Sequence, residues 1–154
     1  MKFTISATEL NAKLIALAKV MNSKVALPIY STFLLELKDG VLRITASDTD
    51  CSRCSTLPVI DMDGANGHSE SICVTASFLL DSLKNLGDQP VTFEADEENL
   101  SVVIRYNNGQ FDMVGFPAKD YALPGTMGKS VQVTIEASVL NDSIGKSLYA
   151  VGND

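Results

Sequence analysis

Residues 5–14 read ISATELNAKL, and the chain repeats this stretch as VTASFLLDSL at residues 74–83 and IEASVLNDSI at residues 135–144. Each copy has an apolar residue, a polar residue, alanine, and then serine or threonine. Leucine follows after two residues and leucine or isoleucine four residues later, a spacing that places both on one face of a helix. A short extended run precedes each copy. The repeated unit is therefore predicted to be the end of a strand, a polar cap and an amphipathic helix.

The distance between the copies is too long for a solenoid, so the repeat indicates a domain built from two similar halves. We expect this domain to cover residues 1–124. Residues 125–154 are expected to hold a linker and the first strand and helix of a second domain of the same kind. Since one strand and one helix cannot bury their apolar face, the polypeptide is interpreted as a fragment cut just inside that second domain.

Local patterns place the elements of the first half. Ser6 and Glu9 form a capping box, and the helix they open is expected to end near residues 22–23. Lys38, Asp39 and Gly40 form a hairpin turn of the Asp-Gly type. Strands are expected at residues 30–37, 41–46 and 51–59, followed by a turn-rich loop at residues 61–67.

The second half repeats this plan. A short strand ends at Val74, and Thr75 opens a helix that is expected to end at Gly87. Asn107 and Asn108 begin a second hairpin turn. Strands are expected at residues 91–95, 100–106 and 110–116, then a linker, a strand at 131–135 and a helix from residue 136.

The composition is that of a soluble globular protein, with 45% hydrophobic and 20% charged residues. No apolar run approaches the roughly 20 residues that a membrane helix needs, and the first residues do not resemble a signal peptide. A cytoplasmic protein without a membrane partner is therefore expected. The formal net charge of −7 argues against a protein that holds nucleic acid by charge alone.

Cys51 and Cys54 stand three residues apart, as in zinc and redox motifs. A second ligand pair is missing, and the spacing to Cys73 and His68 does not match a zinc knuckle. No helix is predicted to begin beside the pair and lower a thiol pKa. Two short acidic stretches, at residues 48–50 and 61–64, are typical of turns and do not continue as calcium loops. No catalytic residue, metal site or cofactor is therefore predicted.

Four lysines lie on the first two predicted helices or just after them: Lys13, Lys19, Lys24 and Lys84. Most acidic residues fall instead in turns and strands. If the two helices share one face, that face is mildly basic and the rest of the surface acidic. The pattern also fits the ordinary solvated side of an amphipathic helix, and composition does not separate these two interpretations.

Several motifs, taken in order along the whole chain, resemble the bacterial sliding clamp, the beta subunit of DNA polymerase III. They are MKFTI at residues 1–5, LPI at 27–29, ASD at 46–48, VTA at 74–76 and FPAKDY at 116–121. The resemblance implies an α+β DNA-clamp fold with two similar halves, each with one helix and about four antiparallel strands. Helices lie on one face of this fold and sheets on the other. It also implies a ring of two chains, joined head to tail as a homodimer, that encircles duplex DNA and is a processivity factor, not an enzyme.

The resemblance also suggests roles for single residues. Lys24 matches a basic position that faces DNA, and Ser77 stands where some members carry arginine. Asn153 lies near another polar position facing the DNA. With Lys13, Lys19 and Lys84, these residues make up the expected DNA-facing set. Phe111 and Met113 match an apolar pair on the strand that meets the second subunit.

The pocket for polymerase and other partner proteins lies, in the family, between later domains that this chain lacks, so contacts with the polymerase and the clamp loader are expected outside it. A closed ring holds DNA by topology, which is compatible with a net charge of −7. Two alternatives stay open: an interaction domain without a DNA partner, and an enzyme that uses the cysteines or His68.

Overall fold

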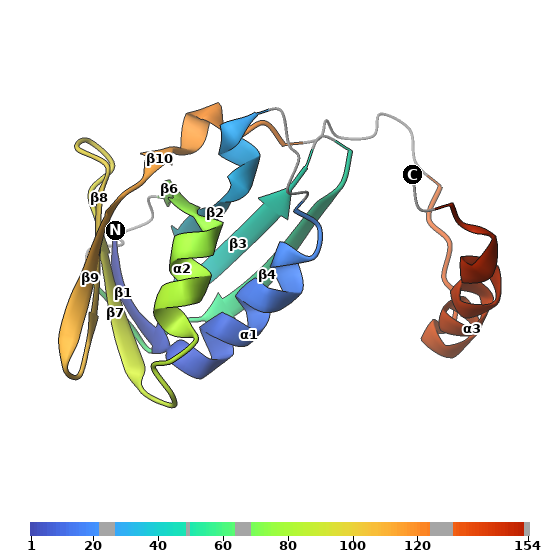
Figure 1. Ribbon diagram of the computed structural model, residues 1–154, viewed down its shortest axis with the longest axis horizontal. Coiled ribbons are helices and arrows are strands. Elements are labelled where there is room, and N and C mark those ends of the chain that lie inside the picture. The colour runs from blue at the N-terminus through green and yellow to red at the C-terminus, as the bar shows by residue number, and fades with distance from the viewer. Residues whose placement is uncertain (22–26, 49, 64–68, 124–130, 153–154) are drawn as a thin grey trace. The chain divides into compact units, whose positions relative to one another are not determined.

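A computed structural model of the protein describes residues 1–21, 27–48, 50–63, 69–123 and 131–152 (Figure 1). The chain divides into two units, Met1–Pro124 and Gly125–Asp154. No helix among the described residues is both long enough and apolar enough to cross a membrane.

The first unit consists of two consecutive halves with the same order of strands and α-helices, which differ in where a 3-10 helix (η) lies. The first half contains β1 (Lys2–Ser6), α1 (Ala7–Ala18), η1 (Pro28–Ser31), β2 (Thr32–Lys38), β3 (Val41–Ser47), β4 (Ser52–Pro58) and β5 (Asp61–Asp63). The second half contains β6 (Glu70–Thr75), α2 (Ala76–Leu83), β7 (Pro90–Ala95), β8 (Ser101–Tyr106), β9 (Gly109–Val114), β10 (Phe116–Pro117) and η2 (Ala118–Asp120). The predicted α+β class, with one helix in each half, is confirmed.

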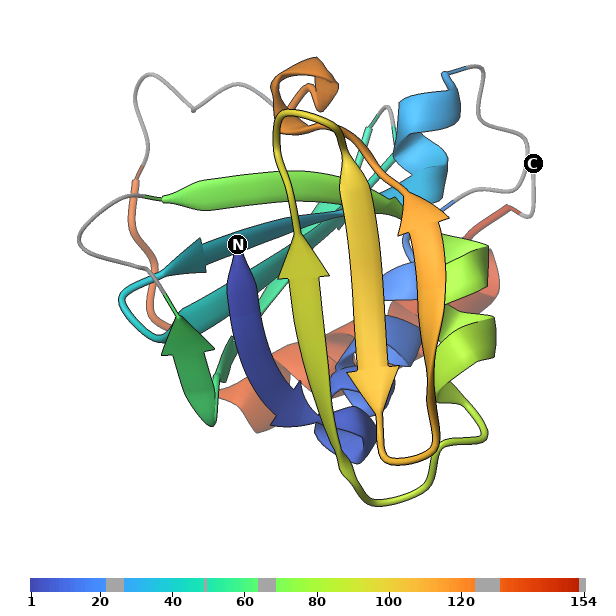
Figure 2. The ribbon, with the colours of Figure 1, turned by 90° about the vertical axis from the view of Figure 1, so that its left-hand side faces the viewer.

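Each of the two sheets takes strands from both halves (Figure 2). One five-stranded antiparallel sheet has the order β5-β1-β7-β8-β9, and the other has the order β10-β6-β2-β3-β4. Replacing every strand by its counterpart in the other half converts the first order into the second. Phe3 of β1 is opposite Phe93 of β7, and Leu35 of β2 is opposite Ile72 of β6. Because neither half holds a complete sheet, the unit is expected to unfold as a whole.

All three α-helices begin at the alanine of the repeated stretch, since α3 of the second unit covers Ala137–Ser147. The polar residue before that alanine is the N-cap residue in each case. At α1, the Ser6 hydroxyl accepts the amide of Glu9 at 3.3 Å, as half of the predicted capping box. Thr75 and Glu136 make no side-chain capping bond. The helix starts are therefore common to the three copies, and the capping bond is particular to the first.

Both helices of the first unit end earlier than predicted. α1 was expected to reach residues 22–23 but ends at Ala18, because the amides that follow it bond to carbonyls three residues back. Such bonds tighten the last turn toward a 3-10 helix. α2 ends at Leu83, before the expected end at Gly87.

Three other segments differ from the sequence-based prediction. The strand expected at residues 30–37 begins at Thr32, because η1 occupies the preceding residues and Pro28 favours its helical φ. Residues 61–63, expected in a loop, form β5 and pair with β1 at the sheet edge. Residues 131–136 form no strand, and the described part of the second unit holds no other strand to which they could bond.

The β2–β3 hairpin confirms the predicted Asp-Gly turn. Asp39 and Gly40 have φ values of 49° and 77°, and both lie in the left-handed region. A type I′ turn requires positive φ at both central residues, which asparagine, aspartate and glycine tolerate best. The turn fixes the register in which Lys38 is opposite Val41, and it thereby fixes which residues of β2 and β3 face the core.

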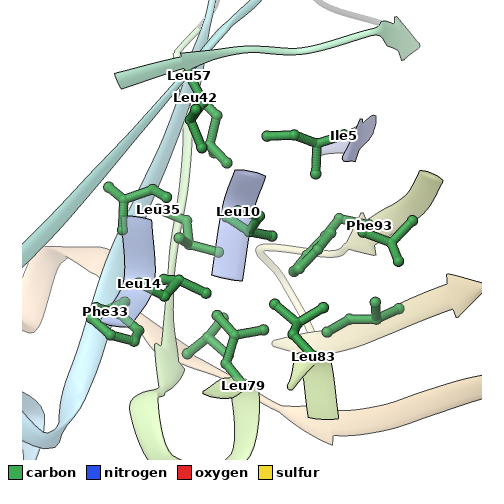
Figure 3. Packing of buried hydrophobic residues seen from close by; sticks show 14 of the residues in the cluster. Ile5, Leu10, Leu14, Phe33, Leu35, Leu42, Leu57, Leu79, Leu83 and Phe93 are labelled. Atoms are coloured by element: carbon green, nitrogen blue, oxygen red, sulfur yellow. The ribbon is translucent and has the colours of Figure 1, made fainter. Parts of the chain in front are cut away.

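One hydrophobic core joins both helices to both sheets (Figure 3). Leu10 and Leu14 of α1 meet Leu79 and Leu83 of α2 in this core. Side chains from both sheets complete it, among them Ile5, Phe33, Leu35, Leu42, Leu57 and Phe93. Continuous burial across both halves explains how one fold holds two helices in a fixed arrangement.

A smaller cluster packs Ala118 and Tyr121, near the end of the first unit, against η1, β2 and β6. The Tyr30 and Tyr121 rings meet edge to face, with their centroids 5.8 Å apart, and the Tyr30 hydroxyl donates to the Ala122 carbonyl at 3.2 Å. Leu34 and Cys73 complete the cluster. Burial raises the pKa of Tyr121 to about 12. These contacts anchor the chain as far as Ala122.

Candidate nucleic-acid interface

The two helices of the first unit lie side by side on one face of the sheets (Figure 1). α1 buries Leu10, Leu14 and Leu17 and exposes its opposite side. α2 buries Leu79 and Leu83 in the same way. The sheet faces turned away from these helices are called the outer faces below. The predicted arrangement, with helices on one face and sheets on the other, is confirmed.

Lys13 and Lys19 are exposed on α1 and at its C-terminal cap. Neither lies within ion-pair distance of a carboxylate among the described residues. They are six residues apart, which places them about 120° apart around the axis of a helix with 3.6 residues per turn. The structure therefore exposes both of these expected DNA-facing residues on α1, but it directs them to different sides of the helix.

The α2 members of the expected set are less favourable for an anion. Lys84 is exposed, but its Nζ lies 2.8 Å from Asp81 Oδ1, so part of its charge is balanced. Ser77 is exposed in the first turn of α2 and carries no charge. Lys24 and Asn153 lie outside the described residues. The cationic character of the helix face is thus centred on α1.

Three cations on the outer faces are paired with glutamates, whereas Lys38, which alternates to the same face as Glu36, has no ion pair among the described residues. On the first sheet, Glu94 lies 3.2 Å from Lys2 Nζ and 3.4 Å from Arg105 Nε. The hydrogen bond from Lys2 is the main cause that lowers the pKa of Glu94. On the second sheet, Arg43 Nε lies 3.7 Å from Glu36. These pairs balance part of the positive charge on the outer faces, whereas Lys13 and Lys19 of α1 are both unpaired among the described residues.

Arg53 on β4 is a cation of the helix face that the sequence analysis did not select. Its Nη1 donates to the carbonyl of Ala16 in α1 at 3.1 Å, and its side chain is exposed. Strand periodicity could have identified it. Side chains of a strand alternate between the two faces, so Arg53 shares its face with the buried Leu57. The cysteines on either side directed the sequence interpretation toward thiol chemistry instead.

The apolar pair expected at a subunit contact lies on an open sheet edge. β9 is the last strand of its sheet, so one side of its backbone has no neighbouring strand among the described residues. Phe111 and Met113 are half-buried and point to the helix side, and Phe111 stacks on Tyr106 with ring centroids 4.9 Å apart. Phe111 lines a groove of about 710 Å³ together with Phe78 and Leu86 of the α2 region.

The three cysteines differ in exposure. Cys51 and Cys54 are exposed and form no disulfide, whereas Cys73 is fully buried. Burial raises the pKa of the Cys73 thiol to about 11, so this thiol is protonated near neutral pH. Within the described ranges, no group of three or more histidine, cysteine, aspartate or glutamate side chains is placed to hold a metal. His68 lies outside those ranges.

The acidic stretch at residues 48–50 builds a turn. Asp48 Oδ1 accepts the amides of Cys51 at 2.7 Å and of Asp50 at 2.9 Å. These two donors lower the pKa of Asp48, because they stabilise its charged form. The carboxylate is therefore engaged in the connection between β3 and β4, which agrees with the turn predicted from the sequence.

Comparison with known proteins adds a family match. The family model described as "DNA polymerase III beta subunit, N-terminal domain" matches residues 1–124. The beta sliding clamp of Vibrio harveyi is 27% identical over 151 residues, which cover 97% of this chain and 100% of that relative. The beta sliding clamp of Vibrio cholerae is 26% identical over 156 residues, covering 99% of this chain and 40% of that relative.

Solved structures of sliding clamps have the same fold as this chain. The DnaN sliding clamp of Pseudomonas aeruginosa, bound to griselimycin, superposes with a TM-score of 0.87 at 23% identity. The Helicobacter pylori beta clamp, bound to a DNA ligase peptide, gives a TM-score of 0.88 at 23% identity. All of this chain is covered in both cases, and it spans 40% and 41% of those longer chains.

Proposed function

The chain belongs to the DNA polymerase III beta subunit family, and we propose that it forms part of a sliding clamp, a ring that encircles duplex DNA and tethers the replicative polymerase. In this proposal two copies of the protein close head to tail, and the described helices line the hole. The role is non-catalytic and needs no cofactor. The second unit, residues 125–154, is the beginning of the next domain of the ring, and the polymerase and clamp loader bind to other parts of the ring.

The observation that carries this proposal is the sorting of charge between the two faces of the fold. Lys13 and Lys19 near α1 have no carboxylate partner among the described residues. On the outer faces three cations, Lys2, Arg43 and Arg105, are paired with glutamates, and Lys38 is the exception. A weakly cationic lining attracts phosphates without holding them in one register, and an acidic exterior repels duplex DNA. The net charge of −7 is then no obstacle, because topology retains the DNA.

Retention on circular DNA tests this function. The proposed ring that contains this chain, called the assembled protein below, is loaded by its clamp loader onto nicked circular plasmid. The complex is then passed through a gel-filtration column at physiological salt. The protein is expected to elute with the plasmid and to be released once a restriction enzyme linearises it. Residues 1–154 alone are expected not to stay on the plasmid, because they cannot close a ring.

Two results would contradict the proposal. Linearisation that leaves the assembled protein on the DNA would show binding by affinity instead of enclosure. Tight binding of residues 1–154 alone at physiological salt would do the same, and would require a cationic surface much stronger than Lys13 and Lys19 supply.

The contact between subunits is proposed to form along β9. Its open backbone edge can pair with another strand, and Phe111 offers an aromatic side chain beside the 710 Å³ groove. Replacing Phe111 with serine is expected to weaken dimerisation about 10-fold, roughly 1.4 kcal/mol. Sedimentation equilibrium of the assembled protein measures this change.

Val114 supplies the matched control on the same strand. It is 71% exposed and alternates to the outer face, away from the groove. Val114→Ser is expected to leave the dimer unchanged. If both variants weakened the dimer equally, or if neither did, β9 would not meet the partner through its helix-side residues. Thermal unfolding of both variants separates a weaker interface from a weaker fold, since Phe111 also packs against the core.

A further inference from the structure

The three arginines of the sequence occupy two different environments. Arg43 and Arg105 lie on outer faces and contact glutamates, with Nε 3.7 Å and 3.4 Å from the carboxylate oxygens. Arg53 contacts no carboxylate among the described residues and donates to a helix carbonyl. Since exposed arginine readily pairs with nearby carboxylates, an arginine that is held in place without one is available to an external anion.

The bond to α1 fixes where this guanidinium lies. Its acceptor is the carbonyl of Ala16, in the last part of the helix. The amide of Val20, which would bond to that carbonyl in a continuing α-helix, bonds to Leu17 instead at 3.2 Å. Arg53 therefore satisfies a carbonyl at the helix end and is held against the last turn of α1, which Lys19 caps.

We infer that Arg53 is a contact for the phosphate backbone of duplex DNA, acting together with Lys13 and Lys19 of α1. This inference rests on the clamp function proposed above. One N–H of Nη1 is used by Ala16, and the other donors of the planar guanidinium are left for a phosphate, which they can bind in a bidentate manner. The helix bond holds the side chain in place, so less rotamer entropy is lost when the phosphate binds.

A purely structural role for the Arg53–Ala16 bond makes different predictions. A cation at a helix C-terminus stabilises that helix whether or not DNA is present. In that case Arg53 would affect the unfolding temperature and leave DNA binding unchanged. A contact with phosphate instead changes the dependence of DNA affinity on salt, because each phosphate neutralised by a cation releases counterions.

Nuclear magnetic resonance of the arginine Nε–H groups provides the direct test, because the chain has only three of them. A short DNA duplex is titrated into residues 1–154 at low salt. The Arg53 signal is expected to shift, and those of Arg43 and Arg105 to stay in place as internal controls. An unmoved Arg53 signal, or equal shifts of all three, would overturn the assignment. So would an equal Arg53 shift with polyglutamate at the same charge concentration, which would indicate any polyanion.

A variant pair extends the test to the assembled protein. Arg53→Gln is expected to reduce the slope of log affinity against log salt by about 0.9, the loss of one phosphate contact. Arg43→Gln, on the neighbouring strand but the opposite face, is expected to leave the slope unchanged. An unchanged slope for Arg53→Gln, with or without a lower unfolding temperature, would refute the phosphate contact.

Retention on circular plasmid, measured for the wild type and for Arg53→Gln, separates this inference from the clamp proposal. Enclosure does not depend on one contact, so Arg53→Gln rings are expected to remain on circular plasmid as long as the wild type does. Failure of the wild type to be retained would refute the clamp function. Normal retention with an unchanged salt slope in Arg53→Gln would refute only the role of Arg53.

Discussion

Replacing Leu14 with alanine is expected to lower the free energy of unfolding of the Met1–Pro124 unit by about 3 kcal/mol, because it removes buried methyl groups and leaves a cavity. The Leu14 side chain is 0% exposed and lies in the core between the helices and the sheets (Figure 3). It also belongs to the repeated stretch from which the fold was predicted. Urea unfolding followed by circular dichroism measures the change.

Ile15 is the matched control for this substitution. It is the next residue of α1, of the same size as leucine, but 51% exposed. Ile15→Ala is expected to change the stability by no more than about 0.5 kcal/mol, as for most surface substitutions. Equal losses at Leu14 and Ile15 would mean that α1 does not present its Leu10–Leu14–Leu17 face to the sheets.

Replacing Gly115 with alanine is expected to cost about 3 kcal/mol, the upper part of the range for overpacking. Gly115 is buried between β9 and β10, where the chain passes from one sheet to the other. A Cβ atom there would lie 2.8 Å from the Cys73 carbonyl oxygen and 2.9 Å from Ile72 side-chain atoms. The carbonyl belongs to β6, which is paired with β2, so it cannot move without disturbing the sheet. Thermal or urea unfolding measures the loss.

Gly109→Ala is the control that separates the steric clash at Gly115 from the general effect of replacing a glycine. A Cβ atom there would also meet an oxygen at 2.8 Å, but that oxygen is the Tyr106 hydroxyl at the end of a side chain. The ring can rotate aside, so Gly109→Ala is expected to cost about 1 kcal/mol or less. If Gly109→Ala were as costly as Gly115→Ala, the rigidity of β6 would not be the cause.

The charge arrangement gives the proposed ring a specific physical character. Three outer-face cations are balanced by Glu36 and Glu94, and the unpaired cations of the first unit include those around α1. DNA inside the ring would meet few fixed charges, so sliding would cost little. On α2, the charge of Lys84 is partly balanced by Asp81. The contribution of Lys24 and Asn153 stays a prediction, because they lie outside the described residues.

Local spacing was enough to predict the helices and the tight turns. The helix starts at Ala7, Ala76 and Ala137 follow from the repeated stretch, and the turn at Asp39–Gly40 follows from its dipeptide. Helix ends were less predictable. The end of α1 depends on whether the following amides bond to carbonyls three or four residues back, and here they bond three residues back. β5 was missed since three residues carry too little periodicity to indicate a strand.

The candidate site was predicted in part. Lys13 and Lys19 were selected from their place on a helix, and the structure leaves both exposed and unpaired among the described residues. Arg53 was missed, although its alternation with Leu57 placed it on the helix side of β4. Its bond to Ala16 joins residues 37 positions apart, and no local pattern contains such a contact.

The sequence by itself determined that this chain has two like halves, where their helices begin, and which helical face is apolar. Those properties depend on neighbours within a few residues. Only the tertiary structure decided that the halves exchange strands, with Lys2 opposite Glu94, and that Arg53 meets α1. Such pairings form because burying one shared core lowers the free energy by more than the entropy lost in closing long loops raises it. Both contributions depend on the whole chain.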